Sequence, residues 1–399
     1  MNILFCSTDS AFACQIVGGA ETSMRFMAEV LTQTKNKPIY LTFGPEKHIP
    51  FNKPKFFNGV KIYTYSKIKL YYLERLARRL GSHVNVTLVK VINEVIFRLL
   101  IIYILKWEKI DVVYTYYEKD LLLKLLNIRS KYSIDVKFVL RMAGLYWYED
   151  ILRHESFLPE YEHIFNEVDS INYLSPSQKK LVEMKINDTK MTVHIKNSFI
   201  CDIGSGFAPI KNINTSIESF NTFKIIVVSR FSDYQKRQDI LIRAISLIKD
   251  IFPMQVVLIG NGVLKEEMVE MSINLGLSGI IIFKDYMPQE KLWQEMASAD
   301  LLCHPCEYEG ISKIILESMS MGIPVLASFV SPLDDYVFDG KNGFLVENEP
   351  TSWAKKILSL KENRELMKEV SLNAVRYIKE NHDPNKNIYK YLEYFQSII

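Results

Sequence analysis

Short runs of β-branched and aromatic residues alternate with amphipathic stretches along the whole chain of 399 residues. In the first half, the strand-like runs are Ile3–Cys6, Ile39–Thr42, Val112–Thr115, Val136–Leu140 and Ile171–Leu174. Helix-like stretches such as Glu21–Thr32 and Asp120–Arg129 fall between them. This alternation is typical of a parallel sheet that helices cover on both faces, so we expect an α/β fold.

A second alternating series follows residues 201–221, where Gly, Pro, Ser and Asn occur without clear periodicity and indicate a linker. Its strand-like runs are Phe223–Ser229, Gln255–Ile259, Ile280–Phe283, Asp300–His304 and Pro324–Ala327. We therefore predict two tandem Rossmann-like, doubly wound domains, residues 1–200 and 201–383, whose strand-end loops face each other across a cleft. Residues 384–399 are expected to form a helix that packs back on the N-terminal domain.

The composition is that of an ordinary globular protein, with 48% hydrophobic and 24% charged residues. The first residues read as a strand and lack the basic and apolar regions of a signal peptide. The cysteines are few and odd in number, which suits a reducing compartment: Cys6, Cys14, Cys201, Cys303 and Cys306. We therefore expect a cytoplasmic protein.

The net charge of +3 conceals an asymmetry, because residues 1–200 hold 28 basic and 20 acidic residues, a balance of +8. Residues 47–109 alone hold 13 basic and 3 acidic residues. Such a half could meet anionic lipid headgroups or a phosphate-bearing acceptor, or it could simply be a solvated surface. No RNA-recognition signature accompanies the charge, so we do not expect nucleic-acid binding.

Two stretches bear on membrane contact. Val95–Leu105 spans 11 apolar-rich residues but includes Arg98, whereas crossing a bilayer needs roughly 20 apolar residues. We expect a buried helix there. Tyr71–Leu80 mixes aromatic, apolar and basic residues, a composition that could lie on a membrane surface.

Two places offer groups that bind phosphate. Gly18 and Gly19 precede a helix-like stretch, where paired glycines and a helix N-terminus could approach an anion, although a tight turn explains them as well. Arg230 and Lys236 follow the strand that ends at Ser229. Two cations at a strand end can clamp a diphosphate and stabilise it as a leaving group, the alternative being ordinary surface charge.

Glu309 and Glu317 are the strongest candidates for sugar or ribose contacts. Glu309 follows the strand Asp300–His304, and Glu317 lies two helical turns later in a run of Ile, Leu and Met. A carboxylate buried in an apolar helix costs free energy unless it accepts hydrogen bonds, which hydroxyl groups of a ligand can donate. A surface pair of glutamates fits poorly with the apolar residues between them.

The two glutamates, followed by Met319-Ser320-Met321-Gly322-Ile323-Pro324-Val325, form a pattern that resembles glycosyltransferase family 4. This is a large group of retaining GT-B enzymes of the "glycosyl transferases group 1" type. The other pieces occur in the family's order: Gly18-Gly19-Ala20-Glu21, Ser229-Arg230 through Lys236, and Ile259-Gly260-Asn261-Gly262. The likeness covers nearly the whole chain and is strongest in residues 223–346.

The resemblance implies transfer of a sugar from a UDP- or GDP-sugar to a glycan or lipid-linked acceptor, with retention and without metal or cofactor. Residues 201–383 would bind the donor and residues 1–200 the acceptor. Catalytic roles would fall to Arg230 and Lys236 at the pyrophosphate and to Glu309 at the donor sugar. Further donor contacts would come from Gly18 and Gly19 at the distal phosphate, the turn at Gly260, Met287 at the base, Gly310, Ile311 and Ser312 through their backbone, and Glu317 at the ribose.

The acceptor side departs from the family pattern. Many relatives carry a histidine near the end of a strand in the N-terminal domain, where this chain has either Arg141 or Ala143 instead. Tyr146, Trp147 and Glu149 follow and suit a sugar acceptor, although simple packing explains the aromatic residues equally well. The missing histidine leaves open which group activates the acceptor.

Other chemistries find less support. Cys303 and Cys306 have a C-x-x-C spacing, but no second ligand pair is evident, so we expect no metal site. Two alternatives remain open beside sugar transfer, namely a GT-B phosphorylase or epimerase and a non-catalytic GT-B scaffold. The family's common role suggests assembly of a bacterial surface polysaccharide, with peripheral contact at the inner face of the cytoplasmic membrane.

Overall fold

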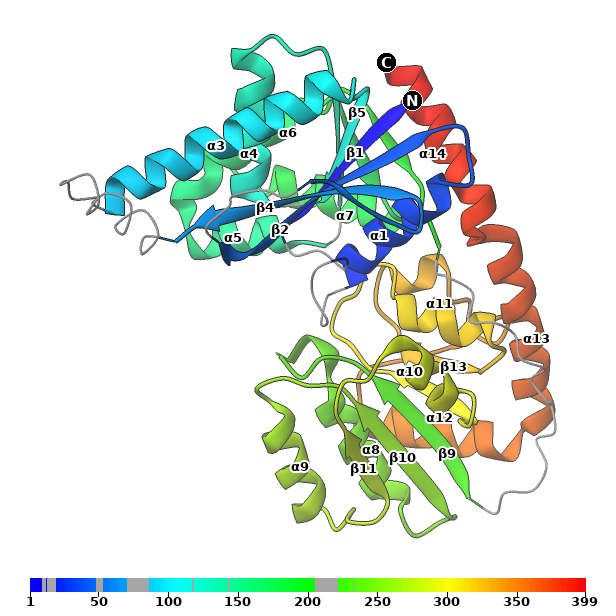
Figure 1. The fold of residues 1–399 in the computed structure, drawn as a ribbon. Coiled ribbons are helices and arrows are strands. Elements are labelled where there is room, and N and C mark those ends of the chain that lie inside the picture. The colour runs from blue at the N-terminus through cyan, green and yellow to red at the C-terminus, as the bar shows by residue number, and fades with distance from the viewer. Residues whose placement is uncertain are drawn as a thin grey trace. The chain divides into compact units, whose positions relative to one another are not determined.

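The computed structural model describes residues 1–8, 12, 19–47, 53–69, 86–116, 118–142, 144–204, 222–232 and 234–399, with the backbone alone for 45–47. Predictions about Cys14, Gly18, Ala143 and Tyr71–Leu80 therefore lie outside the described residues. The chain forms two compact units (Figure 1). Unit 1 comprises Met1–Leu174, Lys179–Ile203 and Pro384–Ile399, and unit 2 comprises Ser175–Gln178 and Gly204–Asp383.

Unit 1 contains one sheet in the order β3-β4-β2-β1-β5-β6-β7-β8, parallel throughout except for β3. Its strands are β1 Asn2–Cys6, β2 Lys37–Lys47, β3 Lys55–Phe57, β4 Val60–Ile68, β5 Val112–Tyr116, β6 Lys137–Arg141, β7 Ser170–Tyr173 and β8 Ser198–Ile200. In the centre, Leu4 of β1 stands level with Ile39 on one side and Val113 on the other. These apolar strands read as continuous hydrophobic runs because both faces of the sheet are covered.

Two groups of helices cover the faces of this sheet (Figure 1). The helices of this part of the chain are α1 Gly19–Leu31, α3 Val86–Trp107, α4 Lys119–Lys131, α5 Tyr146–Arg153, α6 Leu158–Glu167, α7 Pro176–Asn187 and α14 Pro384–Ile398. Helices α3, α4 and α6 share one hydrophobic cluster, and α1 and α14 share the other. The last helix of the chain thus completes the core of unit 1.

Unit 2 is built on a wholly parallel sheet in the order β11-β10-β9-β12-β13-β14. The strands are β9 Phe223–Val228, β10 Met254–Ile259, β11 Ile281–Lys284, β12 Leu301–His304, β13 Val325–Ser328 and β14 Phe344–Val346. The helices are α8 Gln238–Ile248, α9 Lys265–Asn274, α10 Gln289–Met296, α11 Lys313–Ser320, α12 Pro350–Glu362 and α13 Arg364–Asn381. The chain winds outward from β9 to β11, then restarts at β12 on the other side of β9, so the strand order reverses between β9 and β12.

The helix expected to be buried at Val95–Leu105 is buried on one face only. Phe97, Ile101 and Ile104 of α3 belong to the core of unit 1, whereas Leu99 is 61% exposed. The sequence prediction of a buried helix is therefore wrong for half of its surface. No helix in the described part of the chain is both long enough and apolar enough to cross a bilayer.

A hydroxyl of α14 tests how the last helix is held. Tyr391 Oη lies 2.7 Å from the carbonyl oxygen of Cys201 and 3.2 Å from Asn172 Oδ1. We expect Tyr391→Phe to lower the free energy of unfolding of unit 1 by about 1–2 kcal/mol, because the buried oxygens of Cys201 and Asn172 lose the hydroxyl that donates to them. Urea denaturation followed by circular dichroism measures the change. Tyr389→Phe on the same helix, 56% exposed, is the matched control, and equal stability of the two variants would contradict the prediction.

Candidate functional site

The candidate site lies where the strand order of unit 2 reverses. β9 and β12 pair in parallel, with Leu301 level with Ile225 and Leu302 level with Ile226. The loops that follow them, residues 229–232 with 234–237 and residues 305–312, therefore leave the same edge of the sheet. In open α/β sheets this crevice beyond the carboxyl ends of the strands is where ligands bind.

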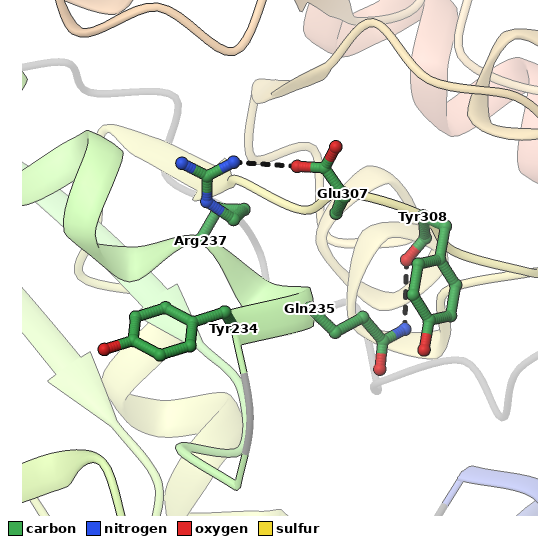
Figure 2. A pocket seen from close by; sticks show the side chains of 5 residues that line it. All are labelled: Tyr234, Gln235, Arg237, Glu307 and Tyr308. Carbon is green, nitrogen blue, oxygen red and sulfur yellow. Dashed lines mark hydrogen bonds and ion pairs between the residues drawn. The ribbon is translucent and has the colours of Figure 1, made fainter. Parts of the chain in front are cut away.

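Direct contacts join the two loops (Figure 2). The Glu307 backbone N–H donates to the Gln235 carbonyl oxygen at 2.7 Å, and Gln235 Nε2 donates to the Tyr308 carbonyl oxygen at 3.0 Å. Arg237 Nη1 donates to Glu307 Oε2 at 2.7 Å. With Tyr234, these residues line an open depression of about 420 Å³. The contacts fix the two loops as one surface.

The guanidinium of Arg237 serves this junction. It also pairs with both carboxylate oxygens of Asp239, at 3.1 and 3.2 Å. Hydrogen bonding to Asp239, helped by Glu307, raises the pKa of Arg237 although partial burial opposes the shift. Arg237 is therefore a structural cation of the loop, and it was not singled out in the sequence.

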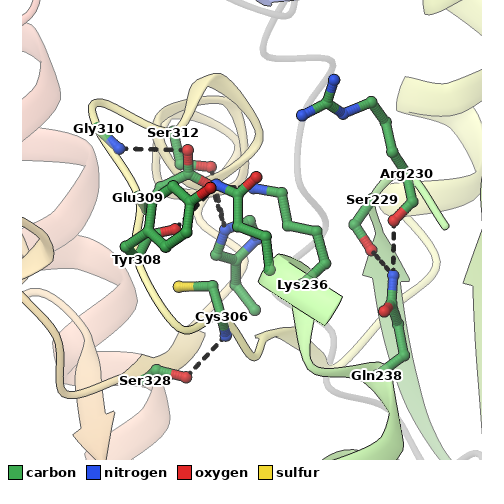
Figure 3. A network of polar contacts seen from close by, with 12 residues as sticks. Ser229, Arg230, Lys236, Gln238, Cys306, Tyr308, Glu309, Gly310, Ser312 and Ser328 are labelled. Atoms are coloured by element: carbon green, nitrogen blue, oxygen red, sulfur yellow. Dashed lines mark hydrogen bonds and ion pairs between the residues drawn. The ribbon is translucent and has the colours of Figure 1, made fainter. Parts of the chain in front are cut away.

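Lys236, Glu309 and His304 form a nearly buried network beside that depression (Figure 3). Lys236 Nζ pairs with Glu309 Oε2, and His304 Nε2 lies 3.0 Å from the same oxygen. Burial alone would raise the pKa of Glu309, but Lys236 and His304 outweigh it and hold this pKa well below the usual range. Burial also lowers the pKa of His304. At neutral pH Glu309 is therefore a carboxylate and His304 a neutral imidazole.

The base of the loop after β12 is clamped by its backbone. The Cys306 N–H donates to Ser328 Oγ at 2.8 Å, and Asn348 Nδ2 donates to the Cys306 carbonyl oxygen at 2.8 Å. Ser328 Oγ in turn donates to Asn348 Oδ1 at 2.5 Å. Burial raises the pKa of the Cys306 thiol to about 12, so this cysteine stays a neutral thiol and a poor metal ligand. In the described residues no group of three His, Cys, Asp or Glu side chains could hold a metal ion.

The start of α11 is arranged by Tyr336. Its hydroxyl accepts from the Ser312 backbone N–H at 2.9 Å and donates to the Gly310 carbonyl oxygen at 3.2 Å. Ser312 has the extended backbone of an N-cap residue, yet its side chain makes no capping hydrogen bond. The first N–H groups of a helix need partners from outside it, and together with the helix dipole they attract an anion. Within the described residues, the start of α11 is thus suited to a phosphate.

Glu317 lies further along the same helix in a different environment. It is 5% exposed, and its Oε2 accepts from Gln289 Nε2 at 3.0 Å and Trp293 Nε1 at 3.3 Å. Burial raises the pKa of Glu317, although Lys313 and the two donors from α10 oppose it. Met287 precedes α10 and packs against the buried hydrophobic cluster to which Ile315 of α11 belongs. The two glutamates therefore have separate partners, with Glu309 in the loop before α11 and Glu317 within the helix.

Gly260 has a structural function at the site. Its φ is +152°, and a Cβ atom there would lie 2.0 Å from the Ser229 carbonyl oxygen. Arg230 follows Ser229, is exposed, and accepts a hydrogen bond from Gln238 Nε2 through its carbonyl oxygen at 2.7 Å (Figure 3). The glycine thus lets the turn after β10 lie directly against the loop that carries Arg230.

The residues expected on the acceptor side belong to unit 1. Arg141 ends β6 and is 6% exposed, and among the described residues its Nη1 has no hydrogen-bond partner. Trp147 is fully buried and packs edge-on against Phe165 with ring centroids 5.1 Å apart, so core packing accounts for it. Tyr146 is exposed, and Glu149 pairs with Arg153 at 3.7 Å. Gly19 is the first residue of α1.

The structure adds four side chains that the sequence analysis did not assign to the site. His304 was named only as the last residue of the strand-like run Asp300–His304, and its position five residues before Glu309 was the available signal. Gln289, Trp293 and Tyr336 come from other segments of unit 2. Nothing local in the sequence connects these three residues with Glu317 or Ser312.

Two doubly wound parallel-sheet units define the GT-B fold class. Sucrose-phosphate synthase from Thermosynechococcus elongatus has a similar fold, with a TM-score of 0.76 and 15% identity over 100% of this chain and 98% of that one. The Anabaena protein HepE, solved with UDP and glucose, has a TM-score of 0.70 and 16% identity over 100% of both chains. The predicted fold class is confirmed.

Within this class, residues 210–377 match the family described as "Glycosyl transferases group 1". An uncharacterized glycosyltransferase of Methanocaldococcus jannaschii is 27% identical over 241 residues, which cover 59% of this chain and 60% of that relative. The expected resemblance to glycosyl transferases group 1 is confirmed, and membership of family 4 in particular stays a prediction. The chain thus spans somewhat under two thirds of this relative's length.

The contact at Gly260 gives a prediction about stability. Gly260→Ala should lower the free energy of unfolding of unit 2 by about 3 kcal/mol or more, because the new methyl group collides with backbone. Gly279→Ala is the matched control, since its φ of +89° is also positive but no atom of the described residues lies within 4 Å of the added carbon. The control should lose only about 1–2 kcal/mol from backbone strain. Chemical denaturation of both variants measures the difference, and equal losses would show that the close approach to Ser229 is unimportant.

Proposed function

We propose that this chain is a glycosyltransferase that binds a nucleotide diphosphate sugar at the carboxyl ends of β9 and β12. The observation that carries the proposal is the chemistry of α11, which offers an uncapped N-terminus at Ser312 and a buried carboxylate at Glu317. The first suits a phosphate and the second suits ribose hydroxyl groups. Five residues of helix rise by about 7.5 Å, which is the order of the distance from a ribose to its distal phosphate.

The phosphates of the donor would lie between α11 and the loop after β9. Arg230 and Lys236 would supply the positive charge, and the backbone of Gly310, Ile311 and Ser312 would approach the ligand from the other side. Charge-assisted hydrogen bonds to phosphate oxygens are roughly twice as strong as neutral ones. These groups would stabilise the diphosphate as the bond to the sugar breaks.

Glu309 would hold the donor sugar. Its low pKa keeps it ionised at neutral pH, and a carboxylate has about four sites at which it accepts hydrogen bonds. Lys236 occupies one of its oxygens together with His304, which leaves acceptor capacity for sugar hydroxyl groups. A lysine shared between Glu309 and the phosphates would couple the position of the sugar to that of its leaving group.

Other features of the donor follow the resemblance. Met287 would line the base, with UDP or GDP as the nucleotide, and Gly18 and Gly19 would meet the distal phosphate. We propose retention of anomeric configuration without a metal or cofactor, since the cations and the helix N-terminus would neutralise the diphosphate. The Anabaena protein of similar fold was solved with UDP and glucose, which supports this ligand class.

We further propose that the acceptor is a glycan or lipid-linked sugar used in bacterial surface polysaccharide biosynthesis, bound by unit 1 near Arg141. The basic excess of residues 47–109 supports a negatively charged or lipid-bearing acceptor. A buried guanidinium whose Nη1 finds no partner in the described part of the chain is costly by itself, and an acceptor phosphate or carboxylate would complete its hydrogen bonds. Tyr146 and Glu149 lie on the helix that follows β6 and would contact sugar hydroxyl groups.

The donor assignment predicts opposite effects of one substitution on binding and on folding. Glu317→Gln should weaken UDP or GDP affinity by about tenfold or more, because charged hydrogen bonds to hydroxyl groups are lost. Without nucleotide the variant should be at least as stable as wild type at neutral pH. Because burial raises the pKa of Glu317, ionising this carboxyl lowers the stability of the folded state. The loss is absent at low pH and grows as the pH rises through the folded-state pKa.

A thermal-shift titration with UDP, GDP, ADP and CMP measures both effects, since a ligand of the folded state raises its midpoint. Glu369→Gln on α13, an exposed position, is the matched control and should bind like wild type. If no nucleotide raises the wild-type midpoint, the donor site is wrong. If a nucleotide binds but no donor is turned over or hydrolysed, the chain is a non-catalytic scaffold.

The acceptor assignment predicts a selective kinetic defect. Arg141→Gln should raise KM for an acceptor that carries phosphate or carboxylate by about tenfold or more and leave KM for the donor unchanged. A neutral acceptor analogue should show a much smaller change, because it does not use the guanidinium charge. Arg153→Gln in the same unit, a position whose side chain is 70% exposed, is the control. An equal rise in KM for charged and neutral acceptors would show that Arg141 is only a structural residue.

A further inference from the structure

Helix α3 of unit 1 presents a continuous row of apolar side chains to solvent. They recur at every fourth residue and are between 46% and 73% exposed: Val91, Val95, Leu99, Tyr103 and Trp107. At 100° per residue, all five lie within about 80° of Leu99 around the helix axis. Exposed apolar residues are usually scattered singly, so an aligned row of this length indicates an interaction surface.

The opposite face holds the helix firmly in unit 1. Phe97, Ile101 and Ile104 are at most 3% exposed and belong to the core beneath the sheet. Tyr103 packs against Tyr63 of β4 with ring centroids 6.4 Å apart and stacks on Trp107 at 6.0 Å. The exposed row is therefore the outward half of a fixed helix.

The charges around the row are positive. Lys106 lies within the row, Arg98 borders it and Lys109 follows the helix. The two acidic residues of this segment already have lysine partners inside unit 1. Glu94 pairs with Lys124, and Glu108 pairs with Lys61, both at 2.6 Å. The surface thus offers apolar side chains and cations together.

From this combination we propose that α3 docks unit 1 on the surface of an anionic lipid bilayer. The row would sink into the region between headgroups and acyl chains, while Arg98 and Lys106 would reach the phosphates with their charged ends. Trp107 and Tyr103 stand together at the end of the helix, and such aromatic residues prefer the interface between lipid and water. The proposal goes beyond the transfer reaction and does not depend on it.

Cosedimentation with vesicles of phosphatidylglycerol and phosphatidylcholine tests the surface. The full chain should bind these vesicles at low salt, bind pure phosphatidylcholine at least tenfold more weakly, and be released at about 1 M salt, where charges are screened beyond about 3 Å. Arg98→Gln with Lys106→Gln should weaken binding by about tenfold or more, because each cation near an anionic surface contributes about a factor of five. Lys291→Gln with Lys368→Gln, two exposed lysines of unit 2, is the charge control.

The apolar row is tested separately. Val95→Gln with Leu99→Gln should weaken vesicle binding by about tenfold or more, and folding should survive because both side chains are exposed. Leu247→Gln with Leu372→Gln removes two side chains of unit 2 that are each 54% exposed, and it should bind like wild type. Equal binding by the Val95/Leu99 variant and this control would overturn the proposal.

Trp107 reports directly on the docking face. It is 73% exposed, whereas Trp147 and Trp353 are fully buried and Trp293 is partly buried. Vesicles should shift the tryptophan emission to shorter wavelength, brominated lipid should quench it, and Trp107→Phe should abolish both effects. Absence of quenching with bound vesicles would place the lipid elsewhere. A concentration-dependent dimer in solution that Val95→Gln with Leu99→Gln dissociates would show that a second copy, rather than lipid, covers the row.

Discussion

The parallel pairing of β9 with β12 brings two loops, distant along the chain, to one edge of the sheet in unit 2. The pair Lys236–Glu309 exists only because of this neighbourhood, and so does the backbone contact between Gln235 and Glu307. A carboxylate as deeply placed as Glu309 would be expensive without its cation, since breaking one partner of a buried pair leaves an uncompensated charge. The topology of the sheet therefore determines both the geometry and the ionisation of the candidate site.

Much of the fold could be predicted, because the signals that define it are local. Phe223–Ser229 and Asp300–His304 are dense apolar runs bounded by polar residues, and the structure places strands there. The strand β4, Val60–Ile68, was not among the runs named. Its lysine, threonine, tyrosine and serine residues dilute the hydrophobic signal, and pairing with β2 and β3 compensates. Helix α3 shows the opposite limit, since its dense apolar run Val95–Leu105 does not by itself reveal which face of the helix is buried.

The residues of the candidate site also differ in whether a local signal in the sequence reveals them. Glu317 could be found from the sequence around it, because a glutamate among Ile, Leu and Met is buried at a cost unless it accepts hydrogen bonds. Its partners Gln289 and Trp293 could not, because they come from α10 and reach Glu317 only through the packing of unit 2. Gly260 shows a second limit, since a G-x-G turn looks the same in sequence whether it contacts a ligand or the backbone of a neighbouring loop.

The backbone clamp at Cys306 divides the loop after β12 into a fixed stem and a replaceable tip. Ser328 and Asn348 hold the main chain of Cys306, and neither the Glu307 nor the Tyr308 side chain takes part. Drift at these two positions leaves the stem in register with the sheet and changes the chemistry that the depression presents, although replacing Glu307 also removes its ion pair with Arg237. The loop therefore provides a path along which proteins built on this scaffold can diverge in what they recognise while keeping Glu309 in place.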